Sequence, residues 1–207
     1  MENFKNLLSE ARKALDKIEH FVTEKGKEDV CLSTLAAGEQ FKVGNTVFIV
    51  LQQCQEENQT KVIQQELFAK GVVYNNDSCD YIHSDLKKKF DSEITPAYEV
   101  LFGSENIVKH TVDLVSVDMQ KYGAFTCKTR PITFDEAREF NELLINKDLP
   151  DWWWTCTPWS SEARDWKYSV AVVAPSGLIC GDGGYDHLGV RPFCILKSNI
   201  FVSRVEE

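Results

Sequence analysis

The sequence lacks the long apolar runs by which proteins are exported or held in membranes. No stretch of its 207 residues approaches the length of a membrane span, and the N-terminus has no apolar core of a signal peptide. We therefore expect synthesis in the cytoplasm and no membrane partner. Positive charge is also scarce, because 23 Lys and Arg residues face 32 Asp and Glu residues, a net charge of -9. This balance disfavours a broad grip on nucleic-acid phosphates, so no nucleic-acid partner is expected.

Paired cysteines and ion-binding motifs are missing too. The seven cysteines form neither a Cys-x-x-Cys motif nor a Cys/His cluster at zinc-finger spacing, so most are expected to be reduced core residues. The glycine-rich run 181–187 lacks the ending of a phosphate loop and the carboxylate spacing of a calcium loop. On paper, an acid–base site could combine Asp165, Asp182, Asp186 and His187, but nothing in the sequence brings a nucleophile to them. We predict no metal, no cofactor and no enzyme activity.

The first 25 residues are predicted to form one amphipathic, coiled-coil-like helix. Apolar side chains recur there with heptad spacing, at Phe4, Leu8, Ala11, Leu15, Ile18 and Val22. A charged linker around Gly26 follows. Three heptads are marginal for a free-standing coiled coil. The helix is therefore expected either to form a homo-oligomer through residues 4–22 or to pack on its own domain.

Residues 32–207 are predicted to form one domain that begins with a hairpin and short helices. The run 41–51 places a Gly-Asn turn between two β-prone stretches, and 60–68 reads as a further strand. Three capping signals predict helices, namely Ser84 before Asp85, Thr95-Pro96 before residues 97–102 with Gly103 as the stop, and the capping box of Thr133 and Glu136 before residues 134–144.

The second half of this domain is predicted to consist mainly of strands. Residues 112–117 alternate between apolar and polar, and four further candidates lie at 152–155, 168–174, 178–180 and 190–196, with a turn at Pro175-Ser-Gly177. Helices early in the chain and antiparallel strands late in it predict an α+β domain.

Four of the five tryptophans fall within eight positions, at 152–154 and 159. Along a strand, Trp152 and Trp154 point to one side and Trp153 to the other, so we predict that these three rings pack between a helix and the sheet. Trp159 is the better candidate for a partly exposed contact. Arg191 is expected to be structural, with its guanidinium group on carbonyls or a carboxylate.

The order of these elements, the Trp-Trp-Trp-x-x-Thr-Pro run at 152–158 and the closing Gly-Val-Arg-Pro at 189–192 resemble a family of uncharacterised bacterial and prophage domains. The resemblance covers residues 32–197. It implies a C-type lectin-like domain, with antiparallel sheets and two or three helices, akin to formylglycine-generating-enzyme-like domains and to the variable proteins of diversity-generating retroelements. The chain lacks the sugar-binding motifs of calcium-dependent lectins and the paired cysteines of sulfatase-activating enzymes. Neither activity is therefore carried over.

In the variable proteins, the diversified positions lie on C-terminal loops. The resemblance implies that the comparable loops of this chain bind a protein ligand through a mixed polar and aromatic surface, formed by Trp159, Ser160, Ser161, Asp165, Tyr168, Asp182, Tyr185, Asp186 and His187. The leading hypothesis is a ligand-binding or display protein of phage, prophage or bacterial origin, and virion association is left open. The alternatives are a phage-encoded inhibitor of a host protein and a formylglycine-generating-enzyme-like enzyme.

Overall fold

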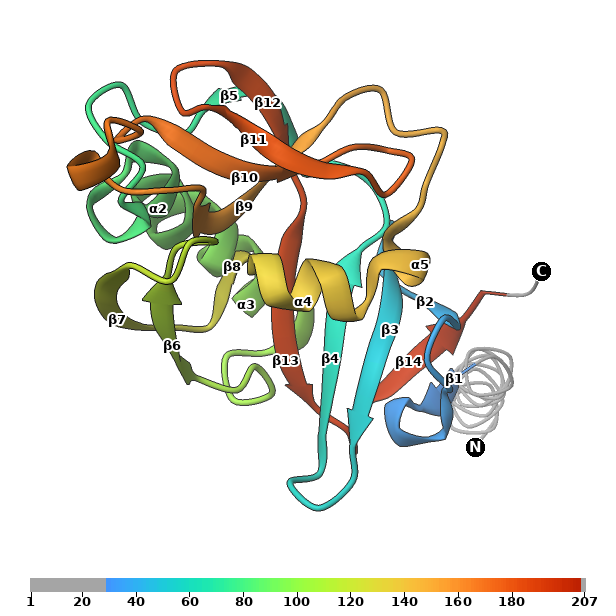
Figure 1. Cartoon of the computed structure of the whole chain (residues 1–207). Coiled ribbons are helices and arrows are strands. Elements are labelled where there is room, and N and C mark those ends of the chain that lie inside the picture. The colour runs from blue at the N-terminus through green and yellow to red at the C-terminus, as the bar shows by residue number, and fades with distance from the viewer. Residues whose placement is uncertain (1–28, 206–207) are drawn as a thin grey trace, which may run out of the picture.

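The computed structural model describes residues 29–205, which form a mixed α+β domain with mostly antiparallel sheets (Figure 1). The α+β prediction is confirmed. The predicted N-terminal helix, residues 1–25, lies outside the described residues. Within 29–205, no helix is long and apolar enough to cross a membrane.

The larger sheet contains seven strands and includes both ends of the described chain. Its order is β1 (Asp29–Cys31), β14 (Phe201–Arg204), β2 (Gln40–Val43), β3 (Thr46–Cys54), β4 (Gln59–Gln64), β13 (Pro192–Lys197) and β8 (Thr129–Pro131). The predicted hairpin is confirmed, with Gly44 at a φ of 59° between β2 and β3. The strand expected over 60–68 is confirmed only as far as Gln64.

The smaller sheet contains five strands and carries the C-terminal loops. Its order is β11 (Ile179–Gly183), β10 (Ser169–Val173), β9 (Trp153–Pro158), β12 (His187–Val190) and β5 (Ala69–Val73), and only the β9–β12 pair is parallel. A separate pair is formed by β6 (His110–Val115) and β7 (Lys121–Cys127). The turn predicted at 175–177 is confirmed between β10 and β11, where the Gly177 N–H donates to the Ala174 carbonyl at 2.9 Å.

The single strand predicted over 190–196 is wrong, because the chain crosses there from one sheet to the other. β12 ends at Val190 in the smaller sheet, and β13 begins at Pro192 in the larger one. Arg191 lies at the crossing and is fully buried. It donates from Nε to the Gln64 carbonyl at 2.7 Å and from Nη1 to the Leu144 carbonyl at 2.8 Å. Its predicted structural role, with the fork on carbonyls, is confirmed.

The helix predicted after Thr95 does not begin there. α2 (Asp85–Lys89), a π-helical turn (Phe90–Ile94) and α3 (Thr95–Phe102) follow one another without a break. Thr95 is itself helical, and its hydroxyl lies 2.6 Å from the Thr129 hydroxyl, so it is not a cap. Proline inside a helix clashes with the carbonyl four residues earlier, and here the π turn lies directly before the turn that contains Pro96. The stop at Gly103 is confirmed by its φ of 81°.

The other predicted helix is confirmed with a break. The capping box of Thr133 and Glu136 is present at the start of α4 (Phe134–Glu139). Phe140 leaves the helical region, with φ -101° and ψ 16°, and α5 (Asn141–Leu144) follows it.

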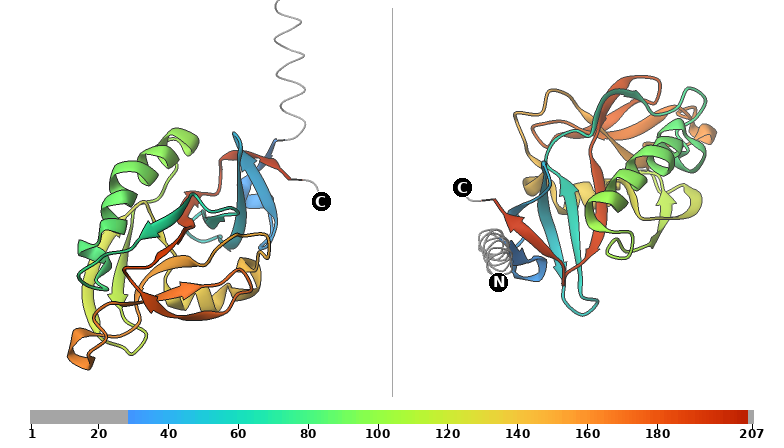
Figure 2. Two further views of the ribbon diagram at one scale, coloured as in Figure 1. Left: turned by 90° about the horizontal axis from the view of Figure 1, so that it is seen from above. Right: turned by 180° about the vertical axis from the view of Figure 1, so that it is seen from behind.

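The two faces of the sheets bury two separate cores. In β3, Phe48 and Val50 belong to the core under α2 and α3, whereas Ile49 and Leu51 face the core under α4 and α5. This follows from the period of two along a strand. Figure 2 (left) accordingly shows the green α2–α3 segment and the yellow α4–α5 segment on opposite sides of the strands.

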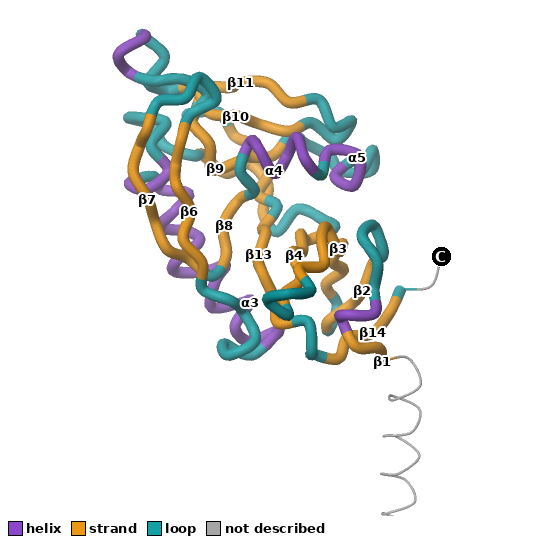
Figure 3. The backbone as a smooth tube through the Cα atoms, turned by 60° about the horizontal axis from the view of Figure 1, so that its bottom comes forward, coloured by secondary structure: helices purple, strands orange, loops and turns teal. Residues whose placement is uncertain are grey.

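The tryptophan run divides between the same two cores. Trp154 and the partly buried Trp152 pack in the first core, and Trp153 packs in the second. The predicted alternation is therefore confirmed. The smaller sheet is thus held from both sides, and the tube drawing in Figure 3 shows β9 and β10 beside α4.

Candidate functional site

Two C-terminal loops meet at the end of the smaller sheet and enclose an open pocket. One loop runs from β9 to β10 and contains a short 3₁₀ helix, η4 (Glu162–Arg164); the other joins β11 to β12. The η4 loop projects from the molecule at the end far from β1 (Figures 1 and 2). The pocket has a volume of about 400 Å³ and is lined by Asp165, Trp166, Tyr168, Ser169, Gly181, Asp182, Gly183 and Tyr185. We call it the loop pocket.

Four of the nine predicted contact residues line this pocket, namely Asp165, Tyr168, Asp182 and Tyr185. Trp159 and Ser160 line an adjacent hollow of about 350 Å³, which shares Trp166 with the loop pocket. Trp159 is half-buried.

The other three predicted residues line neither hollow. Ser161 is buried, and Asp186 is half-buried in the turn between β11 and β12. His187 is exposed at the start of β12, where it pairs with Val73.

Sequence reasoning missed Trp166, which lines both hollows and is 61% exposed. It stands outside the conspicuous tryptophan run. The available signal was an aromatic residue between Asp165 and Lys167, in a polar loop where no strand or helix period calls for an apolar side chain.

The glycines of the run 181–187 let aromatic rings lie directly on the backbone. A Cβ at Gly181 would come within 2.7 Å of the Trp159 ring, and a Cβ at Gly183 within 2.6 Å of the Tyr185 ring. Real Cβ atoms do not tolerate such distances, so any side chain there would displace a ring. The glycine-rich run therefore serves aromatic packing beside the pocket, in agreement with its lack of a phosphate-loop ending.

The η4 loop is tied to the turn between β6 and β7 through Asp118. This carboxylate accepts hydrogen bonds from Ser116 at 2.5 Å and Ser160 at 2.6 Å, and it pairs with Arg164 at 2.8 Å. These hydroxyl donors, together with the Arg164 charge, lower the pKa of Asp118. Tyr122 adds a hydrogen bond to the Ser160 carbonyl at 2.8 Å. The pocket wall is consequently anchored at several points to the β6–β7 pair.

The carboxylates of the loop pocket lack such compensation. Partial burial raises the pKa of Asp182, and the neighbouring Asp186 carboxyl group raises it further, while the Gly183 N–H opposes both effects. Within the described residues, no lysine or arginine forms a salt bridge with Asp165, Asp182 or Asp186. Tyr185 and Tyr168 are 56% and 38% exposed beside them. The pocket thus combines negative charge with accessible aromatic rings.

A second polar cluster is buried between β8 and the start of α4. Arg130 holds Glu136 through two hydrogen bonds of 2.7 and 2.6 Å, and its Nε lies 3.1 Å from the His110 ring. Burial raises the pKa of nearby Cys127 to about 11 and that of Cys156 to about 12, so both remain thiols at neutral pH and are poor nucleophiles. In the part of the chain that the structure describes, no three His, Cys, Asp or Glu side chains are placed to hold a metal ion.

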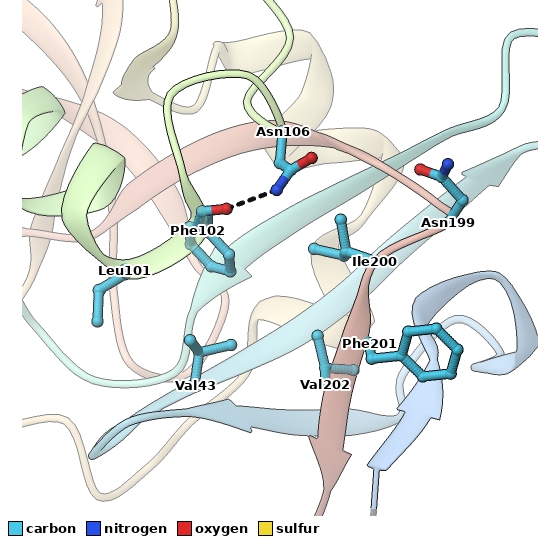
Figure 4. Close-up of a pocket in the computed structure, with 8 residues that line it drawn as sticks. All are labelled: Val43, Leu101, Phe102, Asn106, Asn199, Ile200, Phe201 and Val202. Atoms are coloured by element: carbon cyan, nitrogen blue, oxygen red, sulfur yellow. Dashed lines mark hydrogen bonds between the residues drawn. The ribbon is translucent and has the colours of Figure 1, made fainter.

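Another hollow, of about 390 Å³, lies between the end of α3 and β14 (Figure 4). Its lining combines aliphatic side chains, among them Val43, Ile200 and Val202, with polar groups, and the Asn106 amide donates to the Phe102 carbonyl at 2.8 Å. The Phe201 ring points away from the other apolar side chains (Figure 4). No charged residue lines this hollow, so it has no ionic group to bind a ligand, unlike the loop pocket.

Comparison of the chain with models of known protein families, with curated proteins and with solved structures finds no match in any of the three.

Proposed function

We propose that this chain is a ligand-binding protein that recognises a protein partner through its C-terminal loops, displayed on a C-type lectin-like scaffold. The loop pocket carries the proposal, since Trp166, Tyr168 and Tyr185 gather there with much of their area exposed. Tryptophan and tyrosine supply large contact areas at a low cost in side-chain entropy, and they dominate the energetics of many interfaces.

The support beneath the loops is consistent with such a role. Binding loops work best on a scaffold that does not move with them. Here β9 and β10 are buried along their lengths, and Asp118 and Tyr122 fasten the η4 loop. The loops can therefore vary in sequence while the sheet below them keeps its packing.

The origin and assembly of the protein are part of the same proposal. An amphipathic segment at residues 4–22 would join several copies and multiply weak contacts into higher avidity. A phage, prophage or bacterial source and retroelement diversification follow from the resemblance alone. The absence of a reverse transcriptase and a template repeat near the gene would contradict diversification. An unchanged solution mass after deletion of residues 1–25 would contradict oligomerisation through this segment.

Affinity capture with the whole chain tests the binding function. Full-length protein is used to isolate partners from bacterial lysate, in parallel with a Trp166→Ala, Tyr185→Ala double variant. Loss of two exposed hot-spot rings should weaken a specific partner by about 30-fold or more. The matched control is Phe201→Ala, which removes a ring that is 73% exposed on β14. A partner that survives the double variant but is lost with Phe201→Ala contradicts the proposal.

A further inference from the structure

We propose that the loop pocket binds a cationic side chain of the partner, an arginine or a lysine, held between the aromatic rings and the carboxylates of Asp165 and Asp182. The inference rests on the proposed binding function and names the chemical group that the pocket accepts. It is carried by the lining of the pocket, in which exposed rings and unpaired negative charge occur together.

The aromatic rings provide the first attraction. The face of a tryptophan or tyrosine ring is negative, and a cation within about 6 Å of its centroid is stabilised. The chain already uses this interaction, because the Lys167 Nζ lies 4.8 Å from the Tyr168 ring centroid. Trp166 and Tyr185 remain accessible in the same pocket. A ligand cation in this pocket would lie beside aromatic rings, as the Lys167 ammonium group lies beside the Tyr168 ring.

The carboxylates provide the second attraction. Asp118 has Arg164 and Glu136 has Arg130, whereas no described lysine or arginine pairs with Asp165, Asp182 or Asp186. Asp182 also has an acidic neighbour, because Asp186 acts to raise its pKa. Two neighbouring carboxylates repel each other when both are ionised, and a cation bound beside Asp182 in the pocket relieves that repulsion. The site therefore gains more from a bound cation than a lone surface carboxylate would.

An organic cation fits better than a metal ion. Metal sites bring three or more carboxylate, imidazole or thiolate ligands to one point, and no such group occurs among residues 29–205. Aromatic rings offer nothing to a hydrated metal ion, but they stack well on a planar guanidinium group. The volume of about 400 Å³ lies within the usual range for small-ligand pockets.

The test uses full-length protein and a pair of small probes that differ in charge. N-acetyl-arginine amide is titrated against the protein while the indole N–H signal of Trp166 is followed by NMR, with assignment from a Trp166→Phe variant. N-acetyl-citrulline amide has almost the same shape without the charge. We expect the arginine probe, and its lysine counterpart, to shift this signal, and the citrulline probe to bind about tenfold more weakly or not at all.

Two variants separate a local effect from a change in net charge. Asp182→Asn removes a carboxylate of the pocket, and Asp113→Asn removes one exposed carboxylate on β6. The first should weaken the arginine probe about tenfold, whereas the second should change its affinity less than twofold. Equal binding of the two probes, or equal effects of the two variants, overturns the inference. If partner capture still depends on Trp166 and Tyr185 in that event, the binding function stands and only the cationic ligand fails.

Discussion

Two carboxylates of this domain, Glu136 beside Arg130 and Asp182 beside Asp186, lie in opposite electrostatic environments. Burial on its own would raise the pKa of Glu136, but attraction to Arg130 and hydrogen bonds from Arg130 and Thr133 outweigh it and bring the value to about 2. Burial and the neighbouring acid leave the pKa of Asp182 raised. The first acid has its cation inside the fold. The second has an acid as its neighbour and an open pocket in front of it.

This difference separates a structural charge from one that is available for recognition. Glu136 also closes the capping box at the start of α4, so its charge positions a helix. The Asp182 carboxylate accepts a hydrogen bond from the N–H of Gly183, the next residue in its own strand, at 2.8 Å. A buried charge needs an opposite charge or hydrogen bonds inside the fold. A partly exposed charge is solvated by water and remains available to a ligand.

Removing the charge of Glu136 should cause the largest loss of stability. Glu136→Gln leaves Arg130 buried with no carboxylate, and we expect the free energy of unfolding to fall by about 3–5 kcal/mol. Urea denaturation measures the loss. Glu139→Gln, on an exposed position of α4, should stay within about 0.5 kcal/mol of the parent protein. Equal midpoints for the two variants would show that Arg130 does not depend on Glu136.

Acid should reveal the same pair in the unaltered protein. Because the folded pKa of Glu136, about 2, lies below that of an unfolded glutamate, its contribution is fully present above about pH 4.5. It is lost as the pH falls towards 2, at a cost of about 3 kcal/mol. Urea unfolding from pH 7 to pH 2.5 measures the slope, which should be shallower in Glu136→Gln. Parallel slopes in the two proteins would contradict the assignment.

The smallest effect is expected at Asp182. Its folded pKa is raised, so the proton stabilises the folded state at low pH, and this contribution disappears as the pH rises through the folded pKa. At pH 7 the charge is therefore slightly unfavourable, and Asp182→Asn should leave stability unchanged or raise it by less than about 0.5 kcal/mol. The same urea experiment applies. A loss above about 1 kcal/mol would make Asp182 a structural acid like Glu136 and erase the contrast.

Local signals in the sequence predict much of the fold. The Gly-Asn turn after Val43, the capping box at Thr133 and the alternation of Trp152–Trp154 act over a few residues, and each is found in the structure. The crossing at Arg191 could not be predicted, because its partners are the carbonyls of Gln64 and Leu144, 127 and 47 residues away. The predicted helix start at Thr95 is wrong for a related reason. The preceding helical segment continues through Thr95, so no helix begins there that could be capped.

The sequence predicts several residues of the candidate site but not how the site is built. Asp165, Tyr168, Asp182 and Tyr185 do meet in one pocket. Trp166 was overlooked because a ring's exposure depends on what the rest of the chain leaves uncovered. The anchoring of the η4 loop by Asp118 was invisible for the same reason, since 42 residues separate Asp118 from Ser160.

The place of β14 bears on how the chain folds during its synthesis. β14 lies between β1 and β2, so Val202 faces Val30 on one side and Ser203 faces Lys42 on the other. A ribosome makes the two outer neighbours early, and the strand between them follows only after residues 44–200 have been added. Until residue 204 has left the exit tunnel, β1 has no partner in the sheet and the edge of β2 is unpaired. Completion of the larger sheet must therefore follow synthesis of β14, and until then the edges of β1 and β2 are open to wrong pairing.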